Sequence, residues 1–102
     1  MTKVGEHITL DIIGTTKEYD PSFFEKVIYD IAKAANVTIL KISKYKFEPQ
    51  GFTILALLAE SHISFHTFPE KGIISFDFFT CGKINPSVAV KTVSYTHLTL
   101  PT

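Results

Sequence analysis

The sequence contains one segment whose apolar residues recur at helical spacing, and this segment limits the possible folds more than any other feature. Asp20 followed by Pro21 is a typical pair for an N-cap and the first turn of a helix. The apolar side chains that follow are mostly three or four residues apart: Phe23, Phe24, Val27, Ile28, Ile31 and Ala35. This spacing predicts an amphipathic helix over residues 21–35, whose apolar face packs against another layer.

Sequence typical of β-strands surrounds the helix. Residues 6–13 alternate apolar and polar side chains, as a half-buried strand does. The other predicted strands cover residues 37–47, 53–59, 62–68 and 73–79. We interpret the segments 53–59 and 62–68 as two halves of one continuous run. Turn residues at 48–51 and 69–72 interrupt the strands, and the second of these turns predicts a hairpin.

A second helix is predicted near the end of the chain, with Asn85 as its cap and Pro86 in its first turn. The order of strands and helices favours an α+β fold, a two-layer sandwich with an antiparallel sheet and helices packed on one face. A variant with a parallel edge strand is the alternative. Because β-branched and aromatic residues fall on both faces of the sheet, one face is expected to meet another subunit.

Composition excludes several classes of partner. A chain of 102 residues is long enough for one domain, which we assign to residues 1–92. Ten basic and ten acidic residues balance, which argues against nucleic acid and anionic membranes, and no apolar run approaches a membrane span. Cys81 is the only cysteine, so a reducing, cytoplasmic location is expected. Residues 93–102 lose the apolar spacing and are interpreted either as a ragged C-terminus or as a non-native tail.

The run AESHISFHTF at residues 59–68 concentrates titratable and nucleophilic side chains in strand-like sequence. Taken alone, Ser61 is most simply an ordinary strand residue. His62 and His66 would share one face of a strand but lie about 13 Å apart, which argues against a common metal ion. Taken alone, Cys81 is most simply a small buried hydrophobe. The run has no GxSxG motif, so a hydrolase triad is not favoured.

The combination of these residues is more specific than any member of it. The pattern ESHxSxHT, followed by FPE, a glycine, an apolar strand and FTCG, resembles the bacterial and archaeal S-adenosylmethionine decarboxylase family, pyruvoyl enzymes of polyamine (spermidine) biosynthesis. The matching residues are Glu60, Ser61, His62, Ser64, His66, Thr67, Pro69, Glu70, Gly72, Phe79, Thr80, Cys81 and Gly82. The resemblance extends from Gly5 to about Val90 and so covers most of the chain.

The resemblance implies a proenzyme that cuts itself between Glu60 and Ser61. The Ser61 hydroxyl would attack the preceding carbonyl, and elimination and hydrolysis would leave a pyruvoyl group at the start of the new chain. This group would bind the substrate as a Schiff base in place of pyridoxal phosphate, without a metal. The resemblance also implies that His66 assists proton movements during processing, with support from Thr53. Cys81 would return a proton to the substrate.

The resemblance also implies a substrate and an assembly. Phe47 would stack on the adenine of S-adenosylmethionine, and Glu70 would bind its ribose hydroxyls. The family's small enzymes are similar to two-fold dimers of cleaved protomers with sites at the subunit interface, so a homodimer is expected. The sequence departs from the family at Phe68, where tryptophan is common, and in its short C-terminal part. Decarboxylation of ornithine or arginine, and a non-catalytic, unprocessed binding subunit, are the alternatives.

Overall fold

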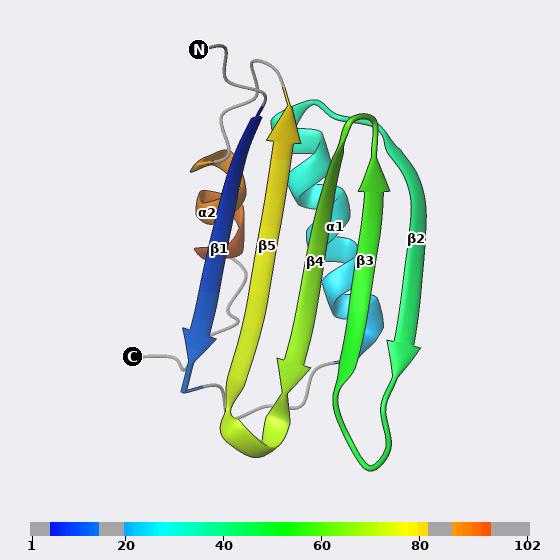
Figure 1. Cartoon of the computed structure of the whole chain (residues 1–102), viewed down its shortest axis with the longest axis vertical. Coiled ribbons are helices and arrows are strands. Elements are labelled where there is room, and N and C mark those ends of the chain that lie inside the picture. The colour runs from blue at the N-terminus through cyan, green and yellow to red at the C-terminus, as the bar shows by residue number, and fades with distance from the viewer. Residues whose placement is uncertain (1–4, 15–19, 82–86, 95–102) are drawn as a thin grey trace.

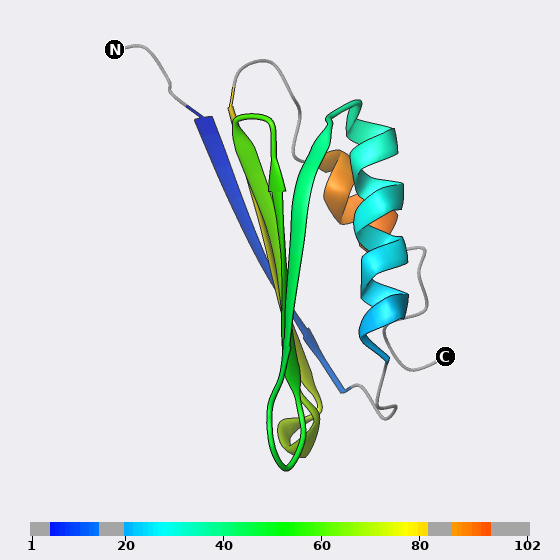
Figure 2. The same cartoon turned by 90° about the vertical axis from the view of Figure 1, so that its right-hand side faces the viewer.

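The computed structural model describes residues 5–14, 20–81 and 87–94, which form a sheet and two helices (Figure 1). The elements in chain order are β1 (Gly5–Ile13), α1 (Pro21–Ala35), β2 (Ile39–Lys46), β3 (Phe52–Leu58), β4 (Ser61–Phe68), the 3-10 turn η1 (Pro69–Lys71), β5 (Ile73–Cys81) and α2 (Ser87–Ser94). The five-stranded sheet has the order β1-β5-β4-β3-β2, and every pair of neighbours is antiparallel. Both helices lie on the same side of the sheet (Figure 2). The predicted α+β two-layer architecture is confirmed.

Helix α1 begins and ends where its sequence predicts. The Asp20 carboxylate accepts a hydrogen bond from the Ser22 amide at 2.9 Å, and this bond lowers the pKa of Asp20. Asn36 adopts a left-handed conformation with φ 57° at the C-cap, and the next amide, from Val37, donates to the carbonyl of Ala32 at 2.9 Å. The predicted apolar stripe faces the sheet, and its buried members are Phe24, Val27, Ile28 and Ile31.

Alternate residues of the sheet build the core against α1. The central strands contribute Ile54, Ala56, Leu58, Ile63, Phe65, Ile74, Phe76 and Phe78, all buried. The Phe65 ring lies between Phe24 and Phe76, with ring centroids 4.9 Å from each. We call the side of the sheet that carries these residues the covered face and the opposite side the open face. In Figure 1 the open face is toward the viewer and the helices are behind it.

The interpretation of 53–59 and 62–68 as one continuous run is wrong. The chain reverses at Ala59 and Glu60, so β3 and β4 form an antiparallel hairpin in which Leu58 lies opposite Ser61. Glu60, the second of the two turn residues, takes a left-handed conformation with φ 63°. Because the turn contains none of the usual glycine, asparagine or proline, the pattern of residue types did not reveal it. The hairpin lets both apolar runs pack on the same helix.

The remaining segments follow the predicted pattern. The 48–51 turn joins β2 to β3, and η1 with Gly72 at φ 64° joins β4 to β5 as the predicted hairpin. The second helix begins at Ser87 in the described range, while its predicted cap and first turn, Asn85 and Pro86, lie outside the described residues. The last two residues of α2 fall in the segment interpreted as a tail, and residues 95–102 lie outside the description. Among the described helices, none has the length and apolarity to cross a bilayer.

Candidate active site

Ser61, the predicted nucleophile, is the first residue of β4 and directly follows the left-handed Glu60. Its side chain shares the covered face with Ile63 and Phe65, which follow at alternate positions. Ser61 is only 7% exposed, and its Oγ has no hydrogen-bond partner within the described part of the chain. A left-handed non-glycine residue costs about 1–2 kcal/mol. The hairpin therefore combines a strained turn with a buried, unpaired hydroxyl at the predicted cleavage site.

Cys81 lies at the same end of the sheet as Ser61. It ends β5, and the β4–β5 register, which pairs His62 with Phe79, places Ser61 beside Thr80. The thiol is partly buried and follows Phe79 on the open face, whereas Ser61 points to the covered face. The structure thus brings two of the predicted catalytic residues to neighbouring strand ends.

His66 and Thr53 form a separate pair on the open face. They lie opposite each other on β4 and β3, with Thr53 Oγ1 2.8 Å from His66 Nδ1. Five residues along β4 separate His66 from Ser61, which corresponds to about 16 Å. His66 therefore cannot reach the Ser61 hydroxyl of its own chain.

The two predicted substrate-binding residues lie beyond His66, at the end of the sheet opposite the cleavage site (Figure 1). Phe47 follows β2, is 47% exposed and has its ring centroid 5.0 Å from that of Tyr45. Glu70 lies in η1, and its carboxylate accepts a hydrogen bond from Gln50 at 3.4 Å. Phe68, where the family often has tryptophan, is 39% exposed at the same end. The predicted residues thus form two groups at opposite ends of one sheet.

A hollow of about 410 Å³ opens on the open face between these two groups. Polar side chains from β1, β3, β4 and β5 line much of it, including Thr9, Asp11, Ser64 and Ser75. Ser75 donates a hydrogen bond to Asp11 at 2.9 Å. Most of the exposed surface inside the hollow is nevertheless apolar, so the hollow provides room for a ligand with apolar parts or for side chains of another chain.

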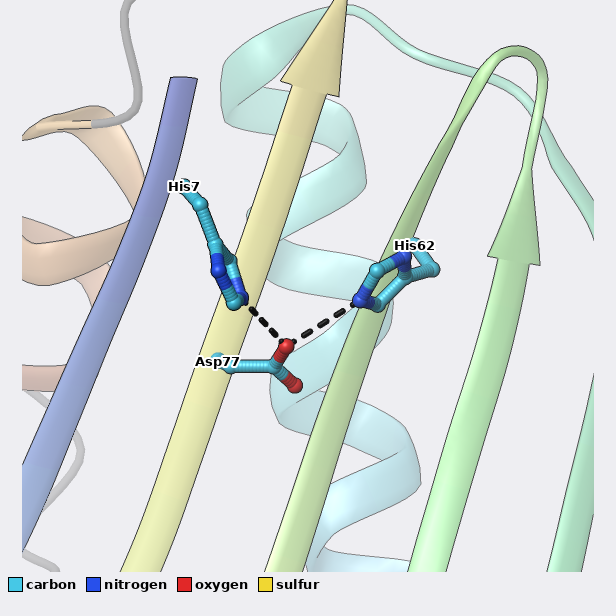
Figure 3. Close-up of side chains that lie close together, drawn as sticks. All are labelled: His7, His62 and Asp77. Atoms are coloured by element: carbon cyan, nitrogen blue, oxygen red, sulfur yellow. Dashed lines mark hydrogen bonds and ion pairs between the residues drawn. The ribbon is translucent and has the colours of Figure 1, made fainter. Parts of the chain in front are cut away.

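A cluster that no sequence pattern revealed lies on the open face beside the hollow, and its members are His7, His62 and Asp77 (Figure 3). Asp77 on β5 accepts from His7 on β1 and from His62 on β4, with Nε2–Oδ2 distances of 2.7 and 3.1 Å. Ser64 donates to the other carboxylate oxygen of Asp77. Partial burial acts to raise the pKa of Asp77, but these three hydrogen bonds outweigh it and lower the pKa. Alternation within β1 and within β5 puts His7 and Asp77 on the side of each strand that carries polar residues. No sequence pattern showed that these two strands are neighbours in the sheet.

Comparison with known proteins gives a consistent result. Residues 6–96 match the family model of S-adenosylmethionine decarboxylase. The chain is 44% identical over 85 residues to the S-adenosylmethionine decarboxylase proenzyme of Methanococcus vannielii, covering 81% of this chain and 70% of that protein. It is 38% identical over 89 residues to the proenzyme of the same name from Brevibacillus brevis, covering 84% of this chain and 67% of that protein.

A solved structure supports the same relationship. The chain matches the crystal structure of the adenosylmethionine decarboxylase of Aquifex aeolicus with a TM-score of 0.76 and 35% sequence identity. The match covers 94% of this chain and 79% of that one. The family predicted from the ESHxSxHT and FTCG motifs is confirmed by sequence and by fold. The chain therefore belongs to the S-adenosylmethionine decarboxylase family, carboxy-lyases of polyamine biosynthesis that are made as proenzymes.

Proposed function

We propose that this chain cuts itself between Glu60 and Ser61 and that the cleaved product decarboxylates S-adenosylmethionine, which supplies the aminopropyl donor for spermidine synthesis. The observation that supports this most strongly is the hairpin turn itself. Ser61 places a buried hydroxyl without a described partner directly after a strained residue, Glu60, where the resemblance to the family predicts cleavage. Because Ser61 Oγ accepts no hydrogen bond from a described neighbour, its lone pairs are free to attack the adjacent carbonyl once a base takes the hydroxyl proton.

The cleavage chemistry balances without any external reagent except water. Ser61 Oγ attacks the carbonyl carbon of Glu60, the C–N bond breaks, and an ester replaces the amide. Removal of the Ser61 α-proton then expels Glu60 as a free carboxylate and leaves a dehydroalanine at position 61. Hydrolysis of that residue releases ammonia and gives a pyruvoyl group. The residues at the turn fit this origin of the group, because serine supplies both the hydroxyl and the carbon skeleton that it needs.

In the finished enzyme the pyruvoyl group supplies the electron sink for loss of carbon dioxide. The chain's own residues hold the substrate and move protons. Cys81, beside the new chain start, is suited to return a proton to the substrate's α-carbon, since a thiol is a weak acid that can donate its proton. Phe47 and Glu70, both exposed on loops, are suited to contact the adenine and the ribose.

A second copy of the chain is needed to complete the site. Ser61 and Cys81 lie at one end of the sheet, whereas Thr53, His66, Phe47 and Glu70 lie toward the other. A two-fold axis that packs two open faces together with their strands reversed brings the cleavage end of each chain against the His66 end of its partner. Leu55 and Leu57, 44% and 52% exposed on that face, supply apolar surface for the contact. We infer a homodimer with two shared sites.

Denaturing mass spectrometry tests the cleavage directly. Purified protein should give a fragment of residues 1–60 and a second fragment that begins at residue 61 and reacts with hydrazine at its ketone. The Ser61→Ala variant should stay intact and release no labelled carbon dioxide from carboxyl-labelled S-adenosylmethionine. A persistently intact wild-type chain would instead support a non-catalytic binding subunit. Faster release from labelled ornithine or arginine would overturn the choice of substrate.

Complementation between variants tests the shared site. His66→Ala and Cys81→Ala should each have strongly reduced turnover when produced alone. When the two variants are produced together, mixed dimers contain one site that has both a wild-type His66 and a wild-type Cys81, so part of the activity should return. If activity returns to no mixture while both variants still form dimers, the two residues act within one chain and the shared site is wrong.

A further inference from the structure

The cluster on the open face around Asp77 has the composition of a metal site. His7, His62 and Asp77 come from the three adjacent strands β1, β4 and β5, and one ligand atom from each lies within 4.8 Å of the other two. All three side chains point into the same space in front of the sheet (Figure 3). Two imidazoles and one carboxylate are a common three-ligand set for zinc and related transition metals.

The distances within the cluster are close to those a metal ion needs. A tetrahedral ion with bonds of about 2.0–2.1 Å holds its ligand atoms about 3.3 Å apart. Asp77 Oδ2 lies 2.7 Å from His7 Nε2 and 3.1 Å from His62 Nε2, so these two pairs must open by only a few tenths of an ångström. The third pair, one ring nitrogen from each imidazole, lies within 4.8 Å and must settle at the same separation. The side chains have room for this adjustment, because His7 is 48% exposed, His62 40% and Asp77 22%.

Neighbouring residues hold the ligands in place. Ser64 donates to Asp77 Oδ1, which orients the carboxylate so that Oδ2 faces both imidazoles. The His62 ring stacks on Phe79 with planes 12° apart and centroids 5.9 Å apart, and the His7 ring meets the same phenyl edge-on.

We propose that His7, His62 and Asp77 bind one divalent transition metal ion, with zinc as the best match. Three protein ligands leave the fourth position free on the open face, where a water, a small anion or a group of the partner chain completes the coordination. Magnesium and calcium are disfavoured because they prefer oxygen ligands. The ion would tie β1 and β4 to β5 directly beside the strand ends that carry Ser61 and Cys81. Metal binding does not depend on cleavage at Ser61.

Titration of the full chain with Co²⁺, followed by competition with Zn²⁺, measures the site. The protein is first dialysed against a chelator, and the Ser61→Ala variant is titrated in parallel, so that the result does not depend on processing. We expect one ion per chain with micromolar or tighter affinity, visible d–d absorption of Co²⁺, and a higher melting temperature with Zn²⁺. An excess of Mg²⁺ should change none of these readings.

Three substitutions and one matched control assign the ligands. His7→Ala, His62→Ala and Asp77→Asn should each weaken the affinity for Co²⁺ at least about tenfold. His66→Ala removes an imidazole from the same strand and the same face as His62 but outside the cluster, and it should bind Co²⁺ as the wild type does. Circular dichroism of each variant, recorded without metal, checks that the fold is retained.

The proposal fails on any of three results. Wild-type protein that binds no Co²⁺ or Zn²⁺ in the micromolar range overturns it. So does binding that survives in both His7→Ala and His62→Ala, because another group then holds the ion. A sulfur-to-cobalt charge-transfer band that disappears in Cys81→Ser would place the metal on the thiol instead of on Asp77.

Discussion

The covered and open faces of the sheet are made by the same strands, yet they differ in almost every physical property. On the covered face Ile54, Phe65 and Phe78 are fully buried against the helices. On the open face the neighbouring positions hold His66 and Asp77, both hydrogen-bonded and only partly buried. The difference shows that the period of two in a strand lets one face pack the core while the other carries most of the polar groups, with Ser61 at the start of β4 as the exception on the covered face.

The largest expected effect on stability is on the covered face. Phe65→Ala removes a ring that packs between Phe24 and Phe76, and it should lower the free energy of unfolding by about 3–5 kcal/mol. Leu57→Ala, on the open face and 52% exposed, should cost about 1 kcal/mol or less. Urea denaturation at one fixed protein concentration measures both. Equal losses would show that the open face is as tightly packed in solution as the covered one.

The contribution of Asp77 to the free energy of unfolding is expected to be smaller than that of Phe65 and to depend on pH. The pKa of Asp77 is lower in the folded chain than its usual value, so the ionised carboxylate stabilises the fold above pH of about 4. This contribution is lost as the pH falls through the folded-state pKa. Asp77→Asn should therefore cost about 1–2 kcal/mol at neutral pH, and the difference from the wild type should shrink in acid.

Denaturation curves of the wild type and of Asp77→Asn, recorded at neutral pH and at about pH 3, measure how their stability difference depends on pH. Asp30→Asn is the control, because Asp30 is exposed on α1 and its contact with Lys26 is long, at 3.7 Å. That variant should differ little from the wild type at either pH. A loss for Asp77→Asn that is the same at both pH values would show that the hydrogen bonds, rather than the charge, carry the stabilisation.

The smallest effect on the free energy of unfolding is expected for a substitution at Leu57. The same substitution tests most directly whether the open face, unlike the covered face, contacts a second chain. Leu57→Glu should change the free energy of unfolding of the isolated chain by about 0.5 kcal/mol or less, because the side chain is exposed. In the proposed dimer the same change buries a charge between two open faces and should shift the protein toward monomer. Sedimentation velocity measures the shift. Tyr29→Glu, at an exposed position on α1, is the control that should leave the assembly unchanged.

Much of the fold could be predicted because its signals are local. The Asp20 cap and the apolar stripe of α1 lie within one segment, and the Ile8, Leu10 and Ile12 side of β1 follows from alternation alone. The turn at Ala59 and Glu60 escaped prediction because neither residue is a typical turn former. Its conformation is imposed by the pairing of Leu58 with Ser61, which is a long-range property of the sheet.

The candidate site divides along the same line. The residue types and spacing of the motif around Ser61, His66 and Cys81 were enough to identify the family. Sequence and fold comparison confirmed that family. The individual roles of these residues, the absence of a metal from catalysis and the cytoplasmic location stay predictions. What the motif could not show is which strands adjoin, because strands that are remote along the chain become neighbours only through the register of the sheet.

The sequence by itself therefore determined the family, the class of fold and the residue types at the cleavage turn, since each of these depends on neighbouring residues or on short periodic patterns. The tertiary structure alone decided that the chain reverses at Ala59 and Glu60, and that His7 and His62 converge on Asp77. The physical reason is strand register. Only the hydrogen-bonded pairing of β1, β4 and β5 decides which polar side chains, remote along the chain, share one point on the sheet.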